Sequence, residues 1–144
     1  GGSDIDNWLV EHFGQTQGLG ISPLTLRLAE RVKIQLSQQP QAQEVYFNDE
    51  TFESYDLQLT RAEFEAMLQR HQFFERLDSC MNQVLQQARR QGLEPGDIDN
   101  VLLVGGTAQI PAVQTWVEQY FDRSKIRCEK PFEAIAQGAL QLMQ

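Results

Sequence analysis

Cysteine and histidine are scarce in this chain of 144 residues, which contains two of each. Cys80 and Cys128 lie far apart, form no C-x-x-C pair and have no pair of histidines nearby. This spacing excludes the common zinc and redox motifs, so we expect two free thiols in a cytoplasmic protein.

Basic residues are few as well. The chain has 12 lysines and arginines against 20 aspartates and glutamates, which gives a formal net charge of -8. A surface for nucleic acid or for an anionic membrane needs clustered cations, so we expect neither partner. The one compact basic spot, Arg89-Arg90, lies at the end of a predicted helix, where cations complement the helix dipole.

Long apolar runs are absent, which argues against a membrane span and a signal peptide. The chain begins with Gly1 rather than Met, as expected for a segment cut from a longer protein. Its length and its hydrophobic content of 41% allow one core, or two small subdomains that share a connection.

The motifs of complete active sites are missing too. The chain has no G-x-x-x-x-G-K-[ST], no H-E-x-x-H and no G-x-S-x-G. His12 lies at the edge of an apolar helix face without a nucleophile beside it, and we expect it to be structural. The sequence therefore predicts no catalytic residue and no metal ligand.

What the chain does contain is a strong strand-turn-helix signal between Val101 and Pro111. Four apolar residues in succession are typical of a strand that is covered on both faces in an α/β sheet. Gly105 and Gly106 follow, and Pro111 suits the first turn of a helix. Such a turn can offer N–H groups to a phosphate, although many glycine turns serve packing alone.

A second signal is the helix that Ser22-Pro23 begins and that runs to about Gln38. Apolar residues recur every four positions along it and form the predicted buried stripe: Leu24, Leu28, Val32 and Leu36. The opposite side gathers four further residues: Glu30, Lys33, Ile34 and Ser37. That side is either a solvated face, with a Glu30 to Lys33 pair worth about 0.2 to 0.5 kcal/mol, or a ligand face on which Ile34 is packed.

The remaining patterns complete an α/β fold class. They predict a short helix over residues 5–13, a hairpin of strands 44–47 and 51–59, and helices from a capping box at Thr60 to Gly92 with a break near His71. After Pro111 they predict an amphipathic helix, a short strand over 126–129 and a closing helix over 134–142. We expect an α+β subdomain over residues 1–95, with helices and a small antiparallel sheet, and a partial α/β subdomain over residues 96–144 with the glycine turn.

Four segments, in matching order, resemble the heat-shock protein 70 (DnaK-type) chaperone family. They are the opening G-G-S-D-I-D-N-W-L-V, then L-A-E-R-V-K-I-Q-L-S, V-L-L-V-G-G-T-A-Q-I-P-A-V-Q and K-P-F-E-A-I-A-Q-G-A. The first resembles the family's G-G-x-D-F-D-N-x-L-V and the last its N-P-D-E-A-V-A-x-G-A. Together they extend over nearly the whole chain.

The resemblance implies the second, C-terminal lobe of an actin-like ATPase domain, without the lobe that carries the first phosphate loop and most catalytic residues. It implies ATP or ADP as cofactor, with magnesium in the full-length parent. The parent would be a cytoplasmic ATPase for protein folding under stress, with a nucleotide-exchange factor and a J-domain co-chaperone as partners. The segment alone would be inactive.

The residues that match the family's nucleotide contacts fall in two groups. Those toward the nucleoside are Glu30, Lys33, Ile34 and Ser37. Those in the glycine turn are Gly105, Gly106, Thr107, Ala108 and Gln109.

Three of the matched positions depart from the family pattern. Ile34 and Gln109 replace two arginines that sandwich the adenine, so a cation-π share of about 0.5 to 2 kcal/mol per contact would be lost. Phe132 replaces the aspartate of the N-P-D-E-A pattern. Adenosine affinity should therefore be weaker than is usual in the family.

Two function classes follow from the sequence. The first is the nucleotide-binding lobe of a chaperone ATPase. The second is a degenerate, non-hydrolysing relative that acts as a protein-interaction module through its α+β part. Other members of the actin and sugar-kinase superfamily fit less well, because the G-G-x-D-F-D-like opening is not their pattern.

Overall fold

The computed structural model describes residues 2–128 and 140–143 of the chain. Two compact units form, one from Gly2–Met67 and one from Leu68 onward. The subdomain boundary that we expect near residue 95 stays a prediction.

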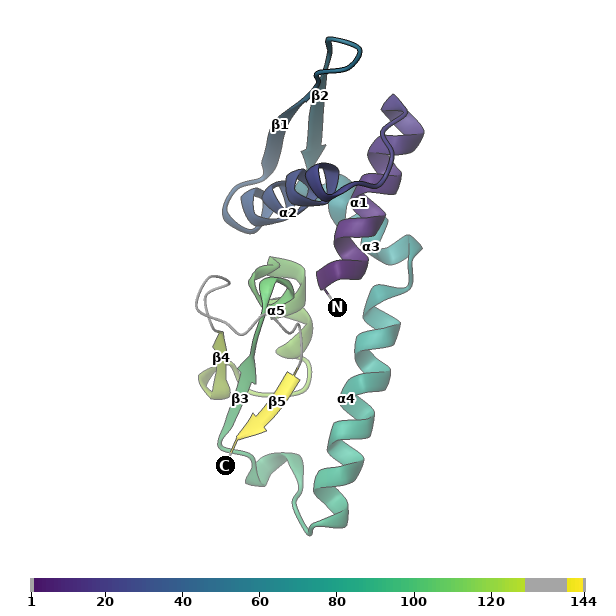
Figure 1. The fold of residues 1–144 in the computed structure, drawn as a ribbon. Helices are drawn as coiled ribbons and strands as arrows, with labels where there is room; N and C mark the ends of the chain where they lie inside the picture. Colours follow the sequence, from purple (N-terminus) through teal and green to yellow (C-terminus); the bar gives the residue numbers. More distant parts are fainter. Residues whose placement is uncertain (1, 129–139, 144) are drawn as a thin grey trace. The chain divides into compact units, whose positions relative to one another are not determined.

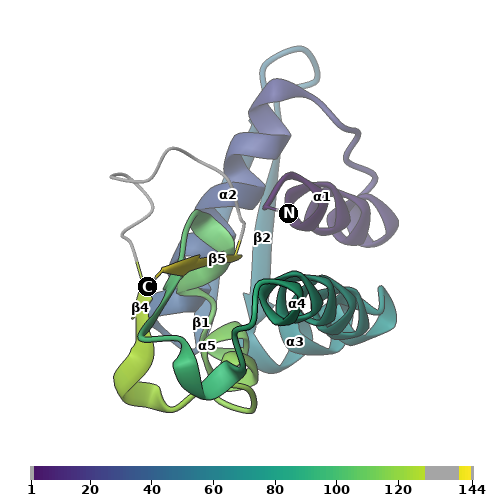
Figure 2. The ribbon, with the colours of Figure 1, turned by 90° about the horizontal axis from the view of Figure 1, so that it is seen from below.

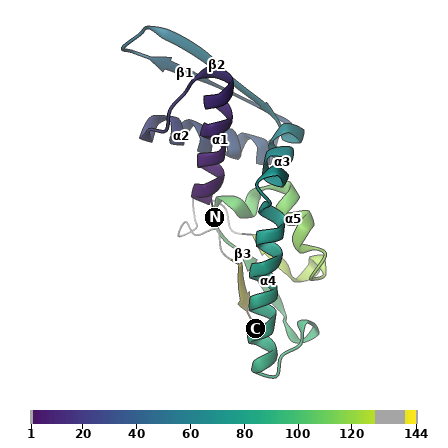
Figure 3. The same cartoon turned by 90° about the vertical axis from the view of Figure 1, so that its right-hand side faces the viewer.

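The first unit contains two helices, a hairpin and most of a third helix: α1 (Gly2–Gln17), α2 (Pro23–Gln38), β1 (Gln41–Asn48), β2 (Glu53–Thr60) and α3 (Arg61–Arg70). Figures 1 and 2 show α2 alongside β1, and Figure 3 shows the hairpin tip projecting past α1 and α2. The core of this unit includes Ile5, Leu9, Val32, Leu57 and Leu59, each at most 2% exposed.

The predicted helix over Pro23–Gln38 is confirmed at both ends. Ser22 caps it, with its Oγ accepting from the Thr25 N–H at 3.1 Å while the Ser22 N–H donates to Thr25 Oγ1 at 2.8 Å. The predicted stripe is wrong at Leu24, which is 44% exposed. A spacing of four residues drifts by about 40° per step on a helix of 3.6 residues per turn, so Leu24 has rotated away from Leu36 by about 120°.

The hairpin is confirmed with shifted bounds: β1 extends beyond the predicted residues 44–47 at both ends, whereas β2 begins two residues later and ends one residue later than the predicted 51–59. Asn48 pairs with Glu53, so the loop covers residues 49–52. The Asn48 side-chain oxygen accepts from the N–H groups of Glu50 and Thr51, and this local bonding delays the start of β2.

The first helix, α1, is longer than predicted, because the Gly18 N–H still donates to the Gly14 carbonyl at 2.8 Å.

The predicted capping box at Thr60 and the predicted break near His71 are both confirmed. Thr60 Oγ1 accepts from the Glu63 N–H at 3.1 Å, and Glu63 Oε1 accepts from the Thr60 N–H at 3.0 Å. Between α3 and the next helix, α4 (Phe73–Arg90), Gln72 adopts a left-handed conformation with φ of 54°.

The second unit combines α4 with a short helix, α5 (Pro111–Val117), and a mixed sheet of β3 (Asn100–Leu103), β4 (Ile126–Cys128) and β5 (Leu140–Met143). Three 3-10 turns connect these elements: Pro95–Asp97, Gly106–Gln109 and Arg123–Lys125. The order is β4-β3-β5, with β4 parallel and β5 antiparallel to β3. The predicted strand near residues 126–129 is confirmed at Ile126–Cys128.

The predicted closing helix is wrong at Leu142, which lies in β5 opposite Val101. Pairing with a sheet edge decides the conformation here, because tertiary context overrides a weak helical pattern. The rest of that predicted helix, over residues 134–139, lies outside the described residues.

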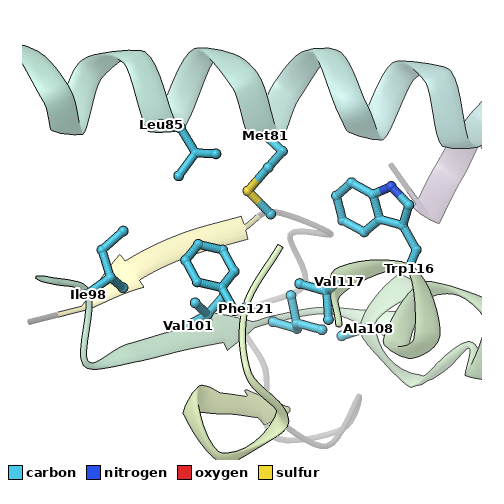
Figure 4. Close-up of a cluster of buried hydrophobic side chains, with 9 residues drawn as sticks. Met81, Leu85, Ile98, Val101, Ala108, Trp116, Val117 and Phe121 are labelled. Atoms are coloured by element: carbon cyan, nitrogen blue, oxygen red, sulfur yellow. The ribbon is translucent and has the colours of Figure 1, made fainter. Parts of the chain in front are cut away.

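An apolar cluster joins α4, β3 and α5 in the second unit. Figure 4 shows Met81 and Leu85 pointing from α4 toward side chains that include Val101, Val117 and Phe121. Val101 and Leu103 are at most 1% exposed, whereas Leu102 on the other face of β3 is half-buried. One face of β3, the strand that leads into the glycine turn, is thus covered by side chains of α4.

In the part of the chain that the structure describes, no helix is both long and apolar enough to cross a membrane.

Candidate functional site

The four α2 residues that the sequence singles out differ widely in exposure. Glu30 is exposed, Ile34 and Ser37 are half-buried, and Lys33 is 5% exposed. The face is therefore neither fully solvated nor uniformly available to a ligand. Ile34 supplies the apolar surface of this face, while the Lys33 ammonium is paired with a carboxylate inside the protein.

Lys33 forms an ion pair with Asp6 of α1. The two groups lie 3.0 Å apart, from Nζ to Oδ1, and the contact falls short of a directional hydrogen bond. Burial raises the pKa of Asp6 above its ordinary value, and the Lys33 ammonium only partly offsets this effect. The pair ties α1 to α2 and holds the lysine ammonium below the surface of the α2 face.

Asp6 is the residue that reasoning from the sequence missed. It belongs to the opening G-G-S-D-I-D segment, so the signal was present in the motif, but no local spacing links it to Lys33. Only the packing of α1 on α2 brings the carboxylate and the ammonium together.

The Ser37 hydroxyl is also partly used in a hydrogen bond within the helix. It donates to the Ile34 carbonyl at 2.6 Å, a bond back to the preceding helical turn. The hydroxyl hydrogen is used in this bond, but the oxygen lone pairs can still accept from a ligand.

The glycine turn follows β3 directly, at the carboxyl end of the strand. Gly105 has φ of 86° and ψ of 178°, which a residue with a Cβ adopts only with strain. Within the turn, the Ala108 N–H donates to Gly105 O and the Ile110 N–H donates to Thr107 O, both at 3.2 Å. The Ala108 N–H, which we expected to face a phosphate or sugar, is therefore used inside the turn.

Thr107 carries an unsatisfied polar atom. The residue is 4% exposed, and its Oγ1 has no hydrogen-bond partner among residues 2–128 and 140–143. A buried hydroxyl without a partner costs about 1 to 3 kcal/mol, so such atoms are rare outside ligand or water sites. Within the described part of the chain, the turn therefore leaves one buried hydroxyl available to a polar partner.

The structure brings each predicted group of residues together by itself. Glu30, Lys33, Ile34 and Ser37 share one face of α2, and Gly105, Gly106, Thr107 and Gln109 share one turn. The approach of the two groups to one another stays a prediction, and Phe132 lies outside the described residues.

The chemistry available at these positions is that of binding. Among the described residues, no group of three or more His, Cys, Asp or Glu side chains could hold a metal ion. Cys80 and Cys128 are free and exposed. On α2, a half-buried apolar side chain and a serine acceptor suit a flat ring or a sugar hydroxyl. In the glycine turn, the threonine hydroxyl that lacks a partner among the described residues suits a sugar or phosphate oxygen.

Comparison with known proteins identifies the family. A family model described as Hsp70 protein matches residues 1–142. Two similar relatives, from two strains of Thermus thermophilus, are both named "Chaperone protein DnaK". Each is 34% identical over 155 residues, an alignment that covers 96% of this chain and 24% of the relative.

The chain therefore belongs to the Hsp70 family. This membership implies the actin-like ATPase fold, and the mixture of helices and small sheets is consistent with a fragment of it. The chain spans about a quarter of the length of the relatives that it matches.

Proposed function

We propose that this chain is the ATP- or ADP-binding part of the C-terminal lobe in an Hsp70-type chaperone. The α2 face meets the nucleoside, and the glycine turn meets the sugar or phosphate side. The full-length protein would couple ATP turnover to peptide binding, with magnesium on the phosphates and with a nucleotide-exchange factor and a J-domain co-chaperone as partners. Family membership supports this proposal.

The observation that carries the proposal is the Thr107 hydroxyl. It is buried, lacks a partner among the described residues, and sits in a turn that requires a left-handed glycine at the end of a strand. Ligands of open α/β sheets gather at the carboxyl ends of strands. A nucleotide oxygen would satisfy the hydroxyl and remove the cost of leaving it unpaired.

Ile34 determines how strongly the proposed site would hold an adenine ring. An aliphatic side chain covers a base by burial of apolar area, which has no charge component. The half-buried Ile34 offers such a surface on α2. We expect adenine to be held more weakly than by an arginine stack, and with little dependence on salt.

Substitution of Thr107 by valine, which has nearly the same shape, tests the proposal in two ways. Without nucleotide, Thr107→Val should raise the free energy of unfolding by about 1 kcal/mol, because it removes an unsatisfied hydroxyl. With ADP, calorimetric titration of the full-length protein should show affinity about tenfold weaker, because the ligand loses a bond worth about 1.4 kcal/mol.

Thr115→Val on α5 is the matched control, since Thr115 is exposed and should change neither quantity. If the unsubstituted full-length protein shows no heat of ADP binding at millimolar concentrations, the proposed function is wrong. Equal ADP affinity for Thr107→Val and for the unsubstituted protein would remove the turn from the site.

The hairpin tip favours a second candidate function, a protein-interaction module. Val45, Phe47 and Phe52 are 54%, 51% and 79% exposed. The ring centroids of Phe47 and Phe52 lie 6.5 Å apart in an edge-to-face arrangement. Between residues 41 and 60 the sequence has five acidic residues and no lysine or arginine: Glu44, Asp49, Glu50, Glu53 and Asp56. Glu44 pairs with Arg31 of α2 at 3.0 Å, so the other four give the hairpin its negative charge. Such a surface fits a basic partner protein with apolar side chains.

The interaction surface at the hairpin has its own test in the full-length protein. Phe52→Ser should weaken binding to a purified nucleotide-exchange factor, measured by surface plasmon resonance, and should leave ADP affinity unchanged. The interaction module fails if Phe52→Ser binds the exchange factor as the unsubstituted protein does.

A further inference from the structure

One carboxylate oxygen on α4 accepts hydrogen bonds from two side chains, one on α5 and one shortly after it. Asp78 Oδ1 accepts from the indole Nε1–H of Trp116 at 2.7 Å and from the Tyr120 hydroxyl at 2.6 Å. Trp116 is 5% exposed, and its ring lies 5.2 Å from that of Tyr120. The bond to Asp78 raises the pKa of Tyr120 to about 12.

The α5 helix is in turn bonded to the glycine turn that precedes it. The Gln114 side chain donates to the Ala108 carbonyl at 3.1 Å, and the Gln114 N–H donates to the Ile110 carbonyl at 3.1 Å. A helix of seven residues has little stability of its own, so its position depends on its contacts. The turn and α5 therefore move together, and Asp78 links them to α4.

We propose that Asp78 is a positioning residue for the glycine turn. It touches no ligand. Through Trp116 and Tyr120 it fixes α5, and through α5 it fixes the carbonyls and N–H groups of residues 105–110. This inference rests on the proposed nucleotide function for its effect on affinity, but its effect on the turn is measurable without nucleotide.

A positioning role predicts an effect that a general loss of stability does not. Asp78→Leu removes the acceptor of both hydrogen bonds. Leu85→Ala, on the same helix and in the same apolar cluster, removes packing but leaves the acceptor in place. If Asp78 only stabilised the fold, the two variants would change the turn and the ligand affinity to the same extent for the same loss of stability.

The first measurement is amide hydrogen exchange in the full-length protein without nucleotide. In Asp78→Leu, the amides of residues 105–110 should exchange about tenfold faster, because two hydrogen bonds that hold α5 are lost. Leu85→Ala should leave those amides within about twofold of the unsubstituted protein once global unfolding is accounted for. Asp78→Asn should behave nearly as the unsubstituted protein, because its amide oxygen can still accept both bonds.

The second measurement is calorimetric titration with ADP. Asp78→Leu should bind ADP about tenfold more weakly, and Leu85→Ala within about twofold of the unsubstituted protein. Glu75→Gln, an exposed acid of α4, controls for the loss of one negative charge and should have no effect.

The outcomes separate the two proposals. Absence of ADP binding in the unsubstituted protein overturns the proposed function, while the exchange measurement still decides the role of Asp78. Exchange rates in Asp78→Leu that match those in Leu85→Ala overturn the positioning role. Should Asp78→Leu fail to fold, Tyr120→Phe removes one of the two donors and should accelerate exchange at residues 105–110 by about threefold.

Discussion

At the scale of single residues, Lys33 shows how a side chain on a predicted ligand face can be occupied inside the protein. Its side chain is 5% exposed, and its ammonium lies 3.0 Å from the Asp6 carboxylate. An ion pair at this depth gains Coulomb energy but loses hydration on both sides, so its net contribution is small while the cost of breaking it is large. The pair fixes the α2 face before any ligand arrives.

Removal of the ammonium alone should therefore destabilise the protein. Lys33→Met leaves a buried carboxylate without a counter-charge and should lower the free energy of unfolding by about 2 to 4 kcal/mol at neutral pH. The double variant Asp6→Asn, Lys33→Met should recover part of this loss, because no charge is then buried. Urea denaturation of the four proteins in this cycle measures the coupling.

The pH dependence gives a second check on the same pair. The pKa of Asp6 is already raised above its ordinary value of 3.8, and loss of Lys33 should raise it further. A raised pKa means that the folded state binds the proton more tightly, so Lys33→Met should regain stability relative to the unsubstituted protein as the pH falls toward 4. If the difference in free energy of unfolding between Lys33→Met and the unsubstituted protein stays constant from pH 7 to about pH 4, this account is wrong.

Ile34 and Gln109 carry the prediction on ligand affinity. If they line an adenine slot, Ile34→Arg with Gln109→Arg should restore two cation-π contacts worth about 1 to 4 kcal/mol before the cost of ordering the side chains. The expected net gain is about tenfold in ADP affinity, measured by titration calorimetry on the full-length protein. Unchanged affinity, together with loss of a protein partner, would favour the interaction module.

At the scale of elements, the junction of α3 and α4 is a place where local conformation and sequence disagree. Gln72 adopts φ of 54°, and its N–H donates to the Gln69 carbonyl at 3.0 Å, which ends α3. This conformation costs a residue with a Cβ about 1 to 2 kcal/mol, whereas glycine adopts it without that cost. The boundary between the two compact units, after Met67, lies within α3 and shortly before this junction.

Gln72→Gly should raise the free energy of unfolding by about 0.5 to 1 kcal/mol, since relief of strain outweighs the added freedom of the unfolded chain. Gln69→Gly, in the last turns of α3, is the control and should lower it by about 1 kcal/mol. Chemical denaturation of both variants gives the comparison. A lower stability for Gln72→Gly would mean that the strain is not stored at this junction.

At the scale of the whole molecule, the chain spans about a quarter of the length of the DnaK relatives, and the proposed function gives it a part in nucleotide binding. The purified chain of 144 residues should release no phosphate from ATP above the buffer background, because the family resemblance places the first phosphate loop and most catalytic residues in another lobe. Turnover that follows the protein through several purification steps would contradict this expectation.

The sequence predicted the elements well where the signal was local. Ser22-Pro23, the Thr60 capping box and the glycine pair each act within a few residues, and the structure confirms the helix starts and the strand-turn-helix unit. It failed where the deciding partner was distant. Leu142 was predicted to be helical, but pairing with Val101 makes it part of a strand.

The sequence by itself determined the family, the order of most elements and the positions of the two candidate groups, because motifs and caps depend on neighbours in the chain. Tertiary structure decided how those positions are used. Packing of α1 on α2 buries Lys33 against Asp6, folding of the turn leaves Thr107 Oγ1 without a partner among the described residues, and packing of α4 on α5 brings Asp78 to Trp116 and Tyr120. Burial and charge pairing depend on residues tens of positions apart, and no local pattern encodes them.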